Sequence, residues 1–111
     1  MMIYKIFRGP EWQQLERDGS TSGAPVDLAD GYIHFSTAET LRGTLEKHFA
    51  GEDGLSLLAC DAEMLGSELR WEPSRGGVLF PHLYRALRRN EVIWQRPLPL
   101  GPDGHEIGEL A

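Results

Sequence analysis

The chain is 111 residues long, close to the common size of one domain, and we expect a single domain over residues 1–111. Its 17 acidic residues outnumber its 11 basic residues, and the formal net charge of −6 argues against long nucleic acid as a partner. One cysteine excludes an internal disulfide, and the lack of a signal-peptide pattern and of a run of ~20 apolar residues predicts a cytoplasmic protein without membrane contact.

The first part of the chain predicts a strand, a short helix and a long loop. β-branched and aromatic residues predict a strand over residues 3–8. A proline in the first turn and a glycine after the last turn predict a helix over residues 10–18. Glycine, proline and small polar residues predict a surface loop over residues 20–30, and loops of that length often carry function.

The middle of the chain predicts a helix and the central strand. Residues 32–35 are expected to form a second strand, and Ser36-Thr37-Ala38-Glu39 has the pattern of a capping box that starts a helix directly afterwards. Leucine and phenylalanine at four-residue spacing from Leu41 to Phe49 give this helix a stripe that packs on the sheet. The apolar run over residues 55–60 predicts a strand covered on both faces, at the centre of the sheet.

Short strands dominate the last part. A capped helical turn is expected over residues 61–65, and residues 73–77 read as a loop. The expected strands cover residues 69–72, 78–80, 83–84 and 92–96. Pro81 indicates an edge strand or a bulge, and residues 97–111 predict an irregular tail. Early helices and late strands together predict an α+β fold with a mixed or antiparallel sheet.

Two polar strand faces are the main candidates for a functional site. Side chains alternate along a strand, so Tyr32, His34 and Ser36 share one face, and His82 and Tyr84 share another. Such faces suggest a cleft lined for hydrogen bonding, where an imidazole can move a proton or hold a ribose hydroxyl. The alternatives are core histidines bonded to backbone carbonyls, and a helix-capping role for Ser36.

A second candidate site lies in the loop that follows the expected strand at residues 69–72. Gly76 and Gly77 let the backbone approach a ligand, and Arg75 can hold a phosphate or carboxylate with two hydrogen bonds. A surface turn with a solvated arginine explains the same residues. Glu72 adds an acid or simply ends its strand, and Arg8 reaches the same cleft if the first two strands are neighbours.

The other histidines carry weaker signals. His48 lies near the C-terminus of its helix, where an imidazolium complements the helix dipole, and His105 lies in the tail. Four scattered histidines and a buried cysteine provide no metal-ligand spacing, so no metal site is expected.

Several stretches together resemble the bacterial family called domain of unknown function 952. They are Asp30 to Glu39, His48-Phe49, Leu69-Arg70-Trp71-Glu72 and Phe80-Pro81-His82-Leu83-Tyr84. The resemblance covers nearly the whole chain, but the family name supplies no activity. The fold that it implies is similar to that of the ADP-ribosyltransferase superfamily, a split-sheet α+β domain that binds NAD or an ADP-ribosylated intermediate.

Within this resemblance, the stretch from Tyr32 to Ser36 looks like the RNA 2′-phosphotransferase strand that reads valine-histidine-leucine-serine. Carried over, His34 and Ser36 contact the ribose or the transferred group. Those transferases have histidine-glycine-threonine in the first strand, where this chain has Arg8-Gly9-Pro10. Proline has no hydroxyl and arginine stays charged, so the departure bears on transfer chemistry more than on ligand binding.

The leading hypothesis is a small enzyme of ADP-ribosyltransferase-like fold that acts on NAD, ADP-ribose or a ribose phosphate, a small-molecule partner. The predicted catalytic residues are His34, Ser36, Glu72 and His82. The predicted ligand-binding residues are Arg8, Tyr32, Arg75, Gly76, Gly77 and Tyr84. Two alternatives remain open: a non-catalytic module that binds a nucleotide or another small anion, and a structural or interaction domain in which both strand histidines are buried and bonded.

Overall fold

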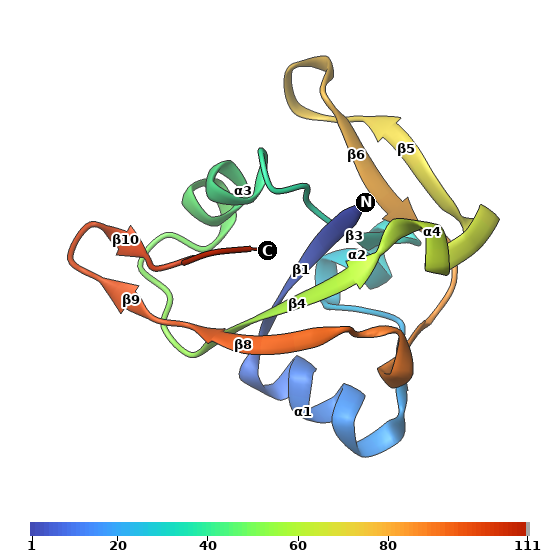
Figure 1. Ribbon diagram of the computed structural model, residues 1–111, viewed down its shortest axis with the longest axis horizontal. Helices are drawn as coiled ribbons and strands as arrows, with labels where there is room; N and C mark the ends of the chain where they lie inside the picture. The colour runs from blue at the N-terminus through green and yellow to red at the C-terminus, as the bar shows by residue number, and fades with distance from the viewer. Residues whose placement is uncertain (111) are drawn as a thin grey trace.

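The computed structural model describes residues 1–110, apart from the side chain of Arg75 (Figure 1). One antiparallel sheet has the strand order β1 (Met2–Arg8), β4 (Leu55–Asp61), β8 (Trp94–Leu98). A second has the order β3 (Ile33–His34), β6 (Leu79–Leu83), β5 (Leu69–Pro73). The short pairs are β2 (Ser20–Thr21) with β7 (Leu87–Arg88), and β9 (Leu100–Gly101) with β10 (Gly104–His105).

Short helices connect these strands. The α-helices are α1 (Gly9–Asp18), α2 (Pro25–Asp30), α3 (Leu41–His48) and α4 (Ala62–Leu65). The 3-10 turns are η1 (Gly66–Glu68), η2 (Arg75–Gly77) and η3 (Arg89–Glu91). None of the helices in the described part has the length and apolar character needed to cross a bilayer. The predicted α+β class is therefore confirmed, with antiparallel sheets.

The central strand β4 separates two hydrophobic cores. On one face, Leu58 packs with residues of α1, β3 and β6, and on the other face Leu57 packs with the apolar stripe of α3. Full burial of a leucine stabilises the fold by ~1.5–3 kcal/mol. The Cys60 thiol is buried in the same strand, which raises its pKa to about 12. The predictions of a central strand covered on both faces and of a helix packed on the sheet are confirmed.

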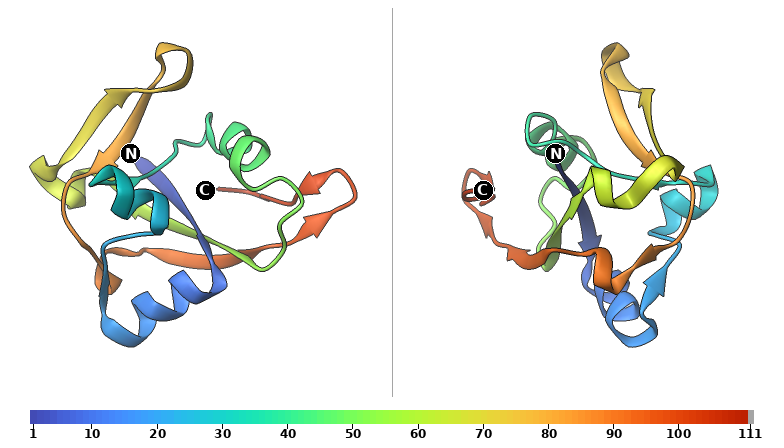
Figure 2. Two further views of the ribbon diagram at one scale, coloured as in Figure 1. Left: turned by 180° about the vertical axis from the view of Figure 1, so that it is seen from behind. Right: turned by 45° about the vertical axis from the view of Figure 1, so that its right-hand side comes forward.

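The segment after β3 joins the two larger sheets. Ser36 forms an isolated antiparallel bridge with Tyr4 of β1, in which each backbone N–H donates to the other residue's carbonyl at 2.8 Å. One residue earlier, the Phe35 N–H donates to the Pro81 carbonyl of β6. Residues 33–36 therefore lie between β1 and β6. Figures 1 and 2 show β5 and β6 projecting from the body as a hairpin, which we call the arm.

The prediction of a surface loop over residues 20–30 is wrong, because this segment contains β2 and α2. Pro25 occupies the first turn of α2, and Gly31 ends the helix with a φ of 85°. Both residues act as helix boundaries here. Asp27 within α2 is only 1% exposed, so the segment is part of the interior as well as the surface.

The predicted capping box at residues 36–39 is also wrong. Helix α3 begins at Leu41 with Thr40 at its N-cap, four residues later than predicted. The bridge to β1 keeps Ser36 in an extended conformation, and its hydroxyl bonds the Thr44 hydroxyl at 2.9 Å. Ser36 therefore belongs to the sheet junction and does not cap the helix.

The strands predicted at residues 78–80 and 83–84 form one strand, β6, and this strand is central in its sheet. The edge position predicted from Pro81 is therefore wrong. In an antiparallel strand, the N and the C=O of one residue face the same neighbouring strand. The nitrogen of Pro81 therefore faces the β3 side, beyond the last paired residue of β3, so its missing N–H costs no hydrogen bond between β3 and β6. The tail expected from residue 97 contains the end of β8 and the β9–β10 hairpin, and Ala111 lies outside the described residues.

Candidate functional site

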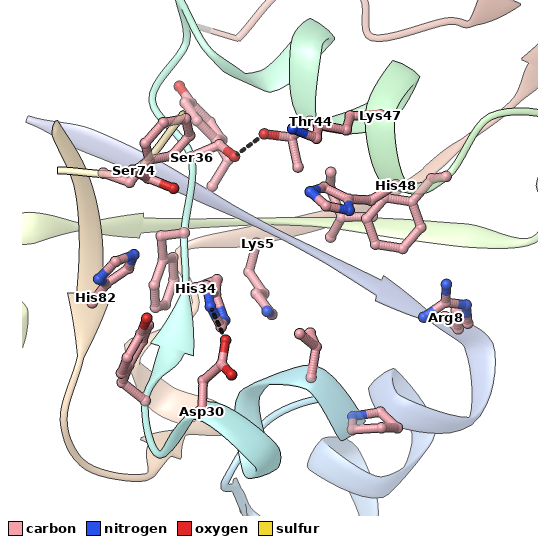
Figure 3. A pocket seen from close by; sticks show the side chains of 18 of the residues that line it. Lys5, Arg8, Asp30, His34, Ser36, Thr44, Lys47, His48, Ser74 and His82 are labelled. Atoms are coloured by element: carbon pink, nitrogen blue, oxygen red, sulfur yellow. Dashed lines mark hydrogen bonds and ion pairs between the residues drawn. The ribbon is translucent and has the colours of Figure 1, made fainter. Parts of the chain in front are cut away.

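A cleft of about 600 Å³ lies beside β1 and the arm (Figure 3). Its lining comes from β1, residues 32–36, both ends of α2, the second half of α3, and the arm. The volume falls within the range of roughly 300–1,000 Å³ that is typical of small-molecule sites. Both His34 and His82 line this cleft, as expected if the two polar strand faces border one site.

The two polar strand faces meet because β3 and β6 pair with each other. His34 lies opposite His82 in the antiparallel register, and cross-strand partners project from the same face of a sheet. Their ring centroids are 5.3 Å apart in an edge-to-face arrangement. Tyr32 stacks on His82 at 4.2 Å and also contacts the rings of His34 and Tyr84. We call these four residues the ring cluster; three of them, Tyr32, His34 and His82, line the cleft.

His34 is held between two carboxylates of α2. Its Nδ1 lies 2.6 Å from Asp27 Oδ1, and its Nε2 lies 3.0 Å from Asp30 Oδ2. Its side chain is 32% exposed, so the ring is accessible from the cleft. The alternative of a core histidine bonded to a backbone carbonyl does not describe this arrangement.

Asp27 connects His34 to a buried lysine. Lys5 Nζ donates to Asp27 Oδ2 at 2.7 Å, and both side chains are almost completely buried. Burial raises the pKa of Asp27, but the hydrogen bond from His34 and the charge of Lys5 outweigh burial, so this pKa is lowered. Burial also lowers the pKa of Lys5, against the attraction of Asp27. The pair keeps an ionised carboxylate next to the His34 ring.

Lys5, Asp27 and Asp30 were not among the predicted site residues. The available signal was Lys5, which alternates with Ile3 and Phe7 along the face of β1 that enters the core. A lysine on such a face requires a buried partner. Asp27 and Asp30 were hidden because the segment that carries them was expected to be a surface loop.

The ring of His82 is hydrogen-bonded to another residue of the arm. Its Nδ1 lies 2.8 Å from Glu72 Oε1, and the Tyr84 hydroxyl donates to the same oxygen at 2.6 Å. Hydrogen bonds from Tyr84 and then from His82 lower the pKa of Glu72, while the bond to Glu72 raises the pKa of Tyr84. Since a carboxylate only accepts, Nδ1 of His82 is the donor, and Nε2 of a neutral ring is an acceptor.

Glu72 and Tyr84 do not line the cleft. Glu72 contacts it only through His82, while Tyr84 and Tyr32 line a smaller hollow of about 210 Å³. Glu72 is therefore not placed to contact a ligand in this cleft, as its predicted role of an acid that polarises a substrate would require. Its contacts are those of a residue that orients His82 and Tyr84.

Arg8 lines the cleft on the side opposite His82 (Figure 3). Its guanidinium donates to both carboxylate oxygens of Glu52, at 2.8 and 3.0 Å, and lies over the Phe49 ring. The bond to Glu52 raises the pKa of Arg8, and the Arg8 bond lowers that of Glu52. Arg8 is therefore close to the site, as predicted, but is already bonded to a carboxylate.

The predicted glycine loop is the turn of the arm. Gly76 and Gly77 have φ values of 63° and 78°, in the left-handed region that favours glycine. Neither residue lines the cleft, whereas Pro73 and Ser74 of the same connection do. The Arg75 side chain lies outside the described residues.

The cleft is more basic than the chain as a whole. Its lining includes Lys5, Arg8 and Lys47, but Asp30 is its only carboxylate among the described residues. Three of the four histidines also line it, including His48, which was interpreted as a helix-dipole residue. Behind the lining, Asp27 pairs with Lys5 and Glu52 pairs with Arg8, and these carboxylates balance the two charges. Lys47 and the imidazoles at the cleft suit a ligand that carries both negative charge and hydrogen-bonding hydroxyls.

Comparison with solved structures finds protein CC0527 from Caulobacter crescentus. Its crystal structure is 47% identical in sequence, covers 97% of this chain and 96% of that chain, and has a TM-score of 0.93. A crystal structure of a double mutant of CC0527 is 45% identical with the same coverages and TM-score. Its solution NMR structure is 48% identical, covers 94% of this chain and 90% of that chain, and has a TM-score of 0.84.

Comparison with curated proteins found no match. A family model described as "Protein of unknown function (DUF952)" matches residues 6–95, which is most of the chain. The chain therefore belongs to the DUF952 family.

Proposed function

We propose that the cleft binds a nucleotide-like ligand of the NAD or ADP-ribose class, in a fold similar to that of the ADP-ribosyltransferases. The observation that carries this proposal is the concentration of basic and imidazole side chains in one cleft of a chain whose net charge is −6. A ring cluster beside those cations supports the same ligand class, because a nucleotide combines phosphates with a flat base and hydroxyl-bearing sugars.

The chemistry of the lining suggests an orientation for this ligand. A base would stack against the ring cluster, and a ribose hydroxyl would donate to Nε2 of His34 in place of its contact with Asp30. The phosphates would lie toward α3, where Lys47 and His48 are exposed at the cleft. This orientation keeps the phosphates away from Asp30.

Ligand binding is better supported than group transfer. Arg8 and Pro10 replace the histidine and threonine of the transferases that the chain resembles, and Arg8 is bonded to Glu52. Glu72, the predicted acid, contacts His82 and Tyr84 outside the cleft lining. The predicted catalytic roles of His34, Ser36 and His82 are therefore proposed here as ligand contacts.

Isothermal titration calorimetry with ADP-ribose, NAD and inorganic pyrophosphate tests the proposal. We expect ADP-ribose and NAD to bind at a single site, and pyrophosphate to bind more weakly because it lacks the ribose and base. Equal affinity for pyrophosphate would favour the small-anion module. No binding of any of the three would contradict the proposal and favour a structural or interaction domain.

Two variants assign the binding to the cleft. His34→Gln should weaken ADP-ribose binding roughly tenfold, the loss expected for one strong hydrogen bond. Gln13→Ala, an exposed position on α1, should leave the affinity unchanged. Incubation with NAD, followed by measurement of free nicotinamide, separates an enzyme from a binding module. We expect no release above that of the protein-free control.

A further inference from the structure

We propose that Asp27, held by Lys5, is a positioning residue for His34: it fixes the ring with the proton on Nδ1, so that Nε2 is the atom offered to the ligand on the side of the ring where Asp30 lies. The role of Nε2 in ligand binding rests on the proposed function. The fixing of the ring by Asp27 does not depend on any ligand.

The first support is the complete use of the Asp27 carboxylate. Oδ1 accepts from the His34 ring at 2.6 Å and from the His34 backbone N–H at 3.0 Å. Oδ2 accepts from Lys5 Nζ and from the Ala24 backbone N–H, both at 2.7 Å. A carboxylate has about four lone-pair sites, and all four are used here. The carboxylate is therefore fixed from four directions, and it fixes Nδ1 in turn.

The second support is the space that the chain leaves for Asp27. Gly23 has a φ of 105°, and a Cβ at this position would collide with the Asp27 side chain. Gly23, which precedes the N-cap of α2, therefore places its backbone directly against the Asp27 carboxylate. The start of α2 is both packed against Asp27 and capped by it.

A structural role alone does not require these charges. An apolar pair of similar volume would hold α2 against β1 without removing two charges from water, and such replacements in other proteins are often neutral or stabilising. An ionised carboxylate does something that an apolar residue cannot do. It determines which imidazole nitrogen carries the proton and fixes the orientation of the ring.

Asp30 lies on the other side of the ring and has different surroundings. Its Oδ2 is 3.0 Å from His34 Nε2, its side chain is 45% exposed, and it lines the cleft. A carboxylate only accepts, so a ring that carries its proton on Nδ1 has an Nε2 lone pair facing Asp30 without a hydrogen bond, whereas a ligand hydroxyl can donate to that nitrogen. Asp30 therefore occupies the space beside Nε2, and its charge opposes an anionic ligand.

The ligand-free test is nitrogen NMR of the histidine rings at alkaline pH, where an unperturbed imidazole is neutral. In the unmodified protein we expect the His34 proton on Nδ1, and in Asp27→Asn we expect part of it to move to Nε2. Glu72→Gln is the matched control, since it changes the partner of His82 and should leave the His34 signals in place. An unchanged His34 tautomer in Asp27→Asn would overturn the inference.

A second variant covers the case in which Asp27→Asn does not fold. Removing Asp27 alone leaves Lys5 buried without its carboxylate, which is costly. The double variant Lys5→Met with Asp27→Asn removes both charges and keeps the volume. It should show the same movement of the His34 proton, and the absence of that movement in a folded double variant would also overturn the inference.

The ligand test uses ADP-ribose as the probe. Asp30→Ala should tighten binding several-fold, whereas Glu63→Ala, which removes the same charge from an 86% exposed side chain on α4, should not. If ADP-ribose binds and Asp30→Ala leaves its affinity unchanged, the role given to Asp30 and Nε2 is wrong while the proposed function stands. If ADP-ribose does not bind the unmodified protein, the proposed function fails and the ring NMR alone decides the role of Asp27.

Discussion

His34 and His82 are both bonded through Nδ1 to a carboxylate, but the surroundings of the two carboxylates differ. Asp27 is completely buried and is shared with Lys5, whereas Glu72 is about one third exposed and is shared with Tyr84. A buried carboxylate interacts more strongly with its partners because less water screens it. We therefore expect His34 to be held more rigidly than His82.

The variant Glu72→Gln should lower the pKa of Tyr84. The hydrogen bond to Glu72 is the largest cause of the raised Tyr84 pKa, so removal of the carboxylate should return this pKa toward its usual value of 10.0. NMR titration of tyrosines labelled with ¹³C at the ring carbon next to the hydroxyl measures the change. Tyr4 is the internal control, because burial is the main cause of its raised pKa. A Tyr84 pKa that stays raised in the variant would contradict the assigned bond.

Among the helices and strands, those features that follow from the periodicity of one segment could be predicted from the sequence. The features that depend on which segments pair or pack with one another could not. The alternation in Tyr32 to Ser36 predicted a polar strand face, and pairing of β3 with β6 places His82 beside it. By contrast, α2 has only six residues, the first of them a proline, and a glycine follows it, so composition alone could not separate it from a loop. Pro81 was assigned to an edge because the local rule cannot anticipate that β3 ends beside it.

Helix α2 carries the two carboxylates that flank His34, and its C-terminal glycine provides a test of its stability. Gly31 has a φ of 85°, and a Cβ added to it would meet no atom within 4 Å, so Gly31→Ala should cost about 1 kcal/mol through backbone strain alone. Gly43 in α3 has the same open surroundings without a positive φ. Gly43→Ala should therefore stabilise the protein by roughly 0.5–1 kcal/mol.

Urea unfolding of both glycine variants measures the two free energies of unfolding on one scale. Equal effects, or stabilisation by Gly31→Ala, would show that Gly31 does not end α2 as described.

For the whole molecule, hydrogen-bonded carboxylates connect distant parts of the fold. Asp27 of α2 is hydrogen-bonded to residues of β1 and β3, and Glu52 is bonded to Arg8 of β1. Glu91 of η3 is bonded to Arg85, which follows β6. The bonds to these carboxylates lower the pKa of each, against the effect of burial. The folded chain therefore holds fewer protons than the unfolded chain at acidic pH.

This proton difference sets the direction of the pH dependence. A carboxylate with a lowered pKa contributes its stability above the usual value of about 4, and that contribution is lost as pH falls through the lowered pKa. We expect the free energy of unfolding to decrease below about pH 4, as measured by urea unfolding across an acidic pH series. The double variant Lys5→Met with Asp27→Asn should show a shallower decrease, and a stability that rises on acidification would contradict the described bonds.

The backbone amide NMR spectrum of the isotope-labelled protein during titration with ADP-ribose tests whether the cleft beside His34 and His82 binds a nucleotide-like ligand. We expect saturable shifts in residues 32–36, in the second half of α3 and in β6 near His82, and no comparable shifts in α1 or α4. An unchanged spectrum at high ADP-ribose, or shifts confined to surfaces outside the cleft, would contradict binding at this cleft.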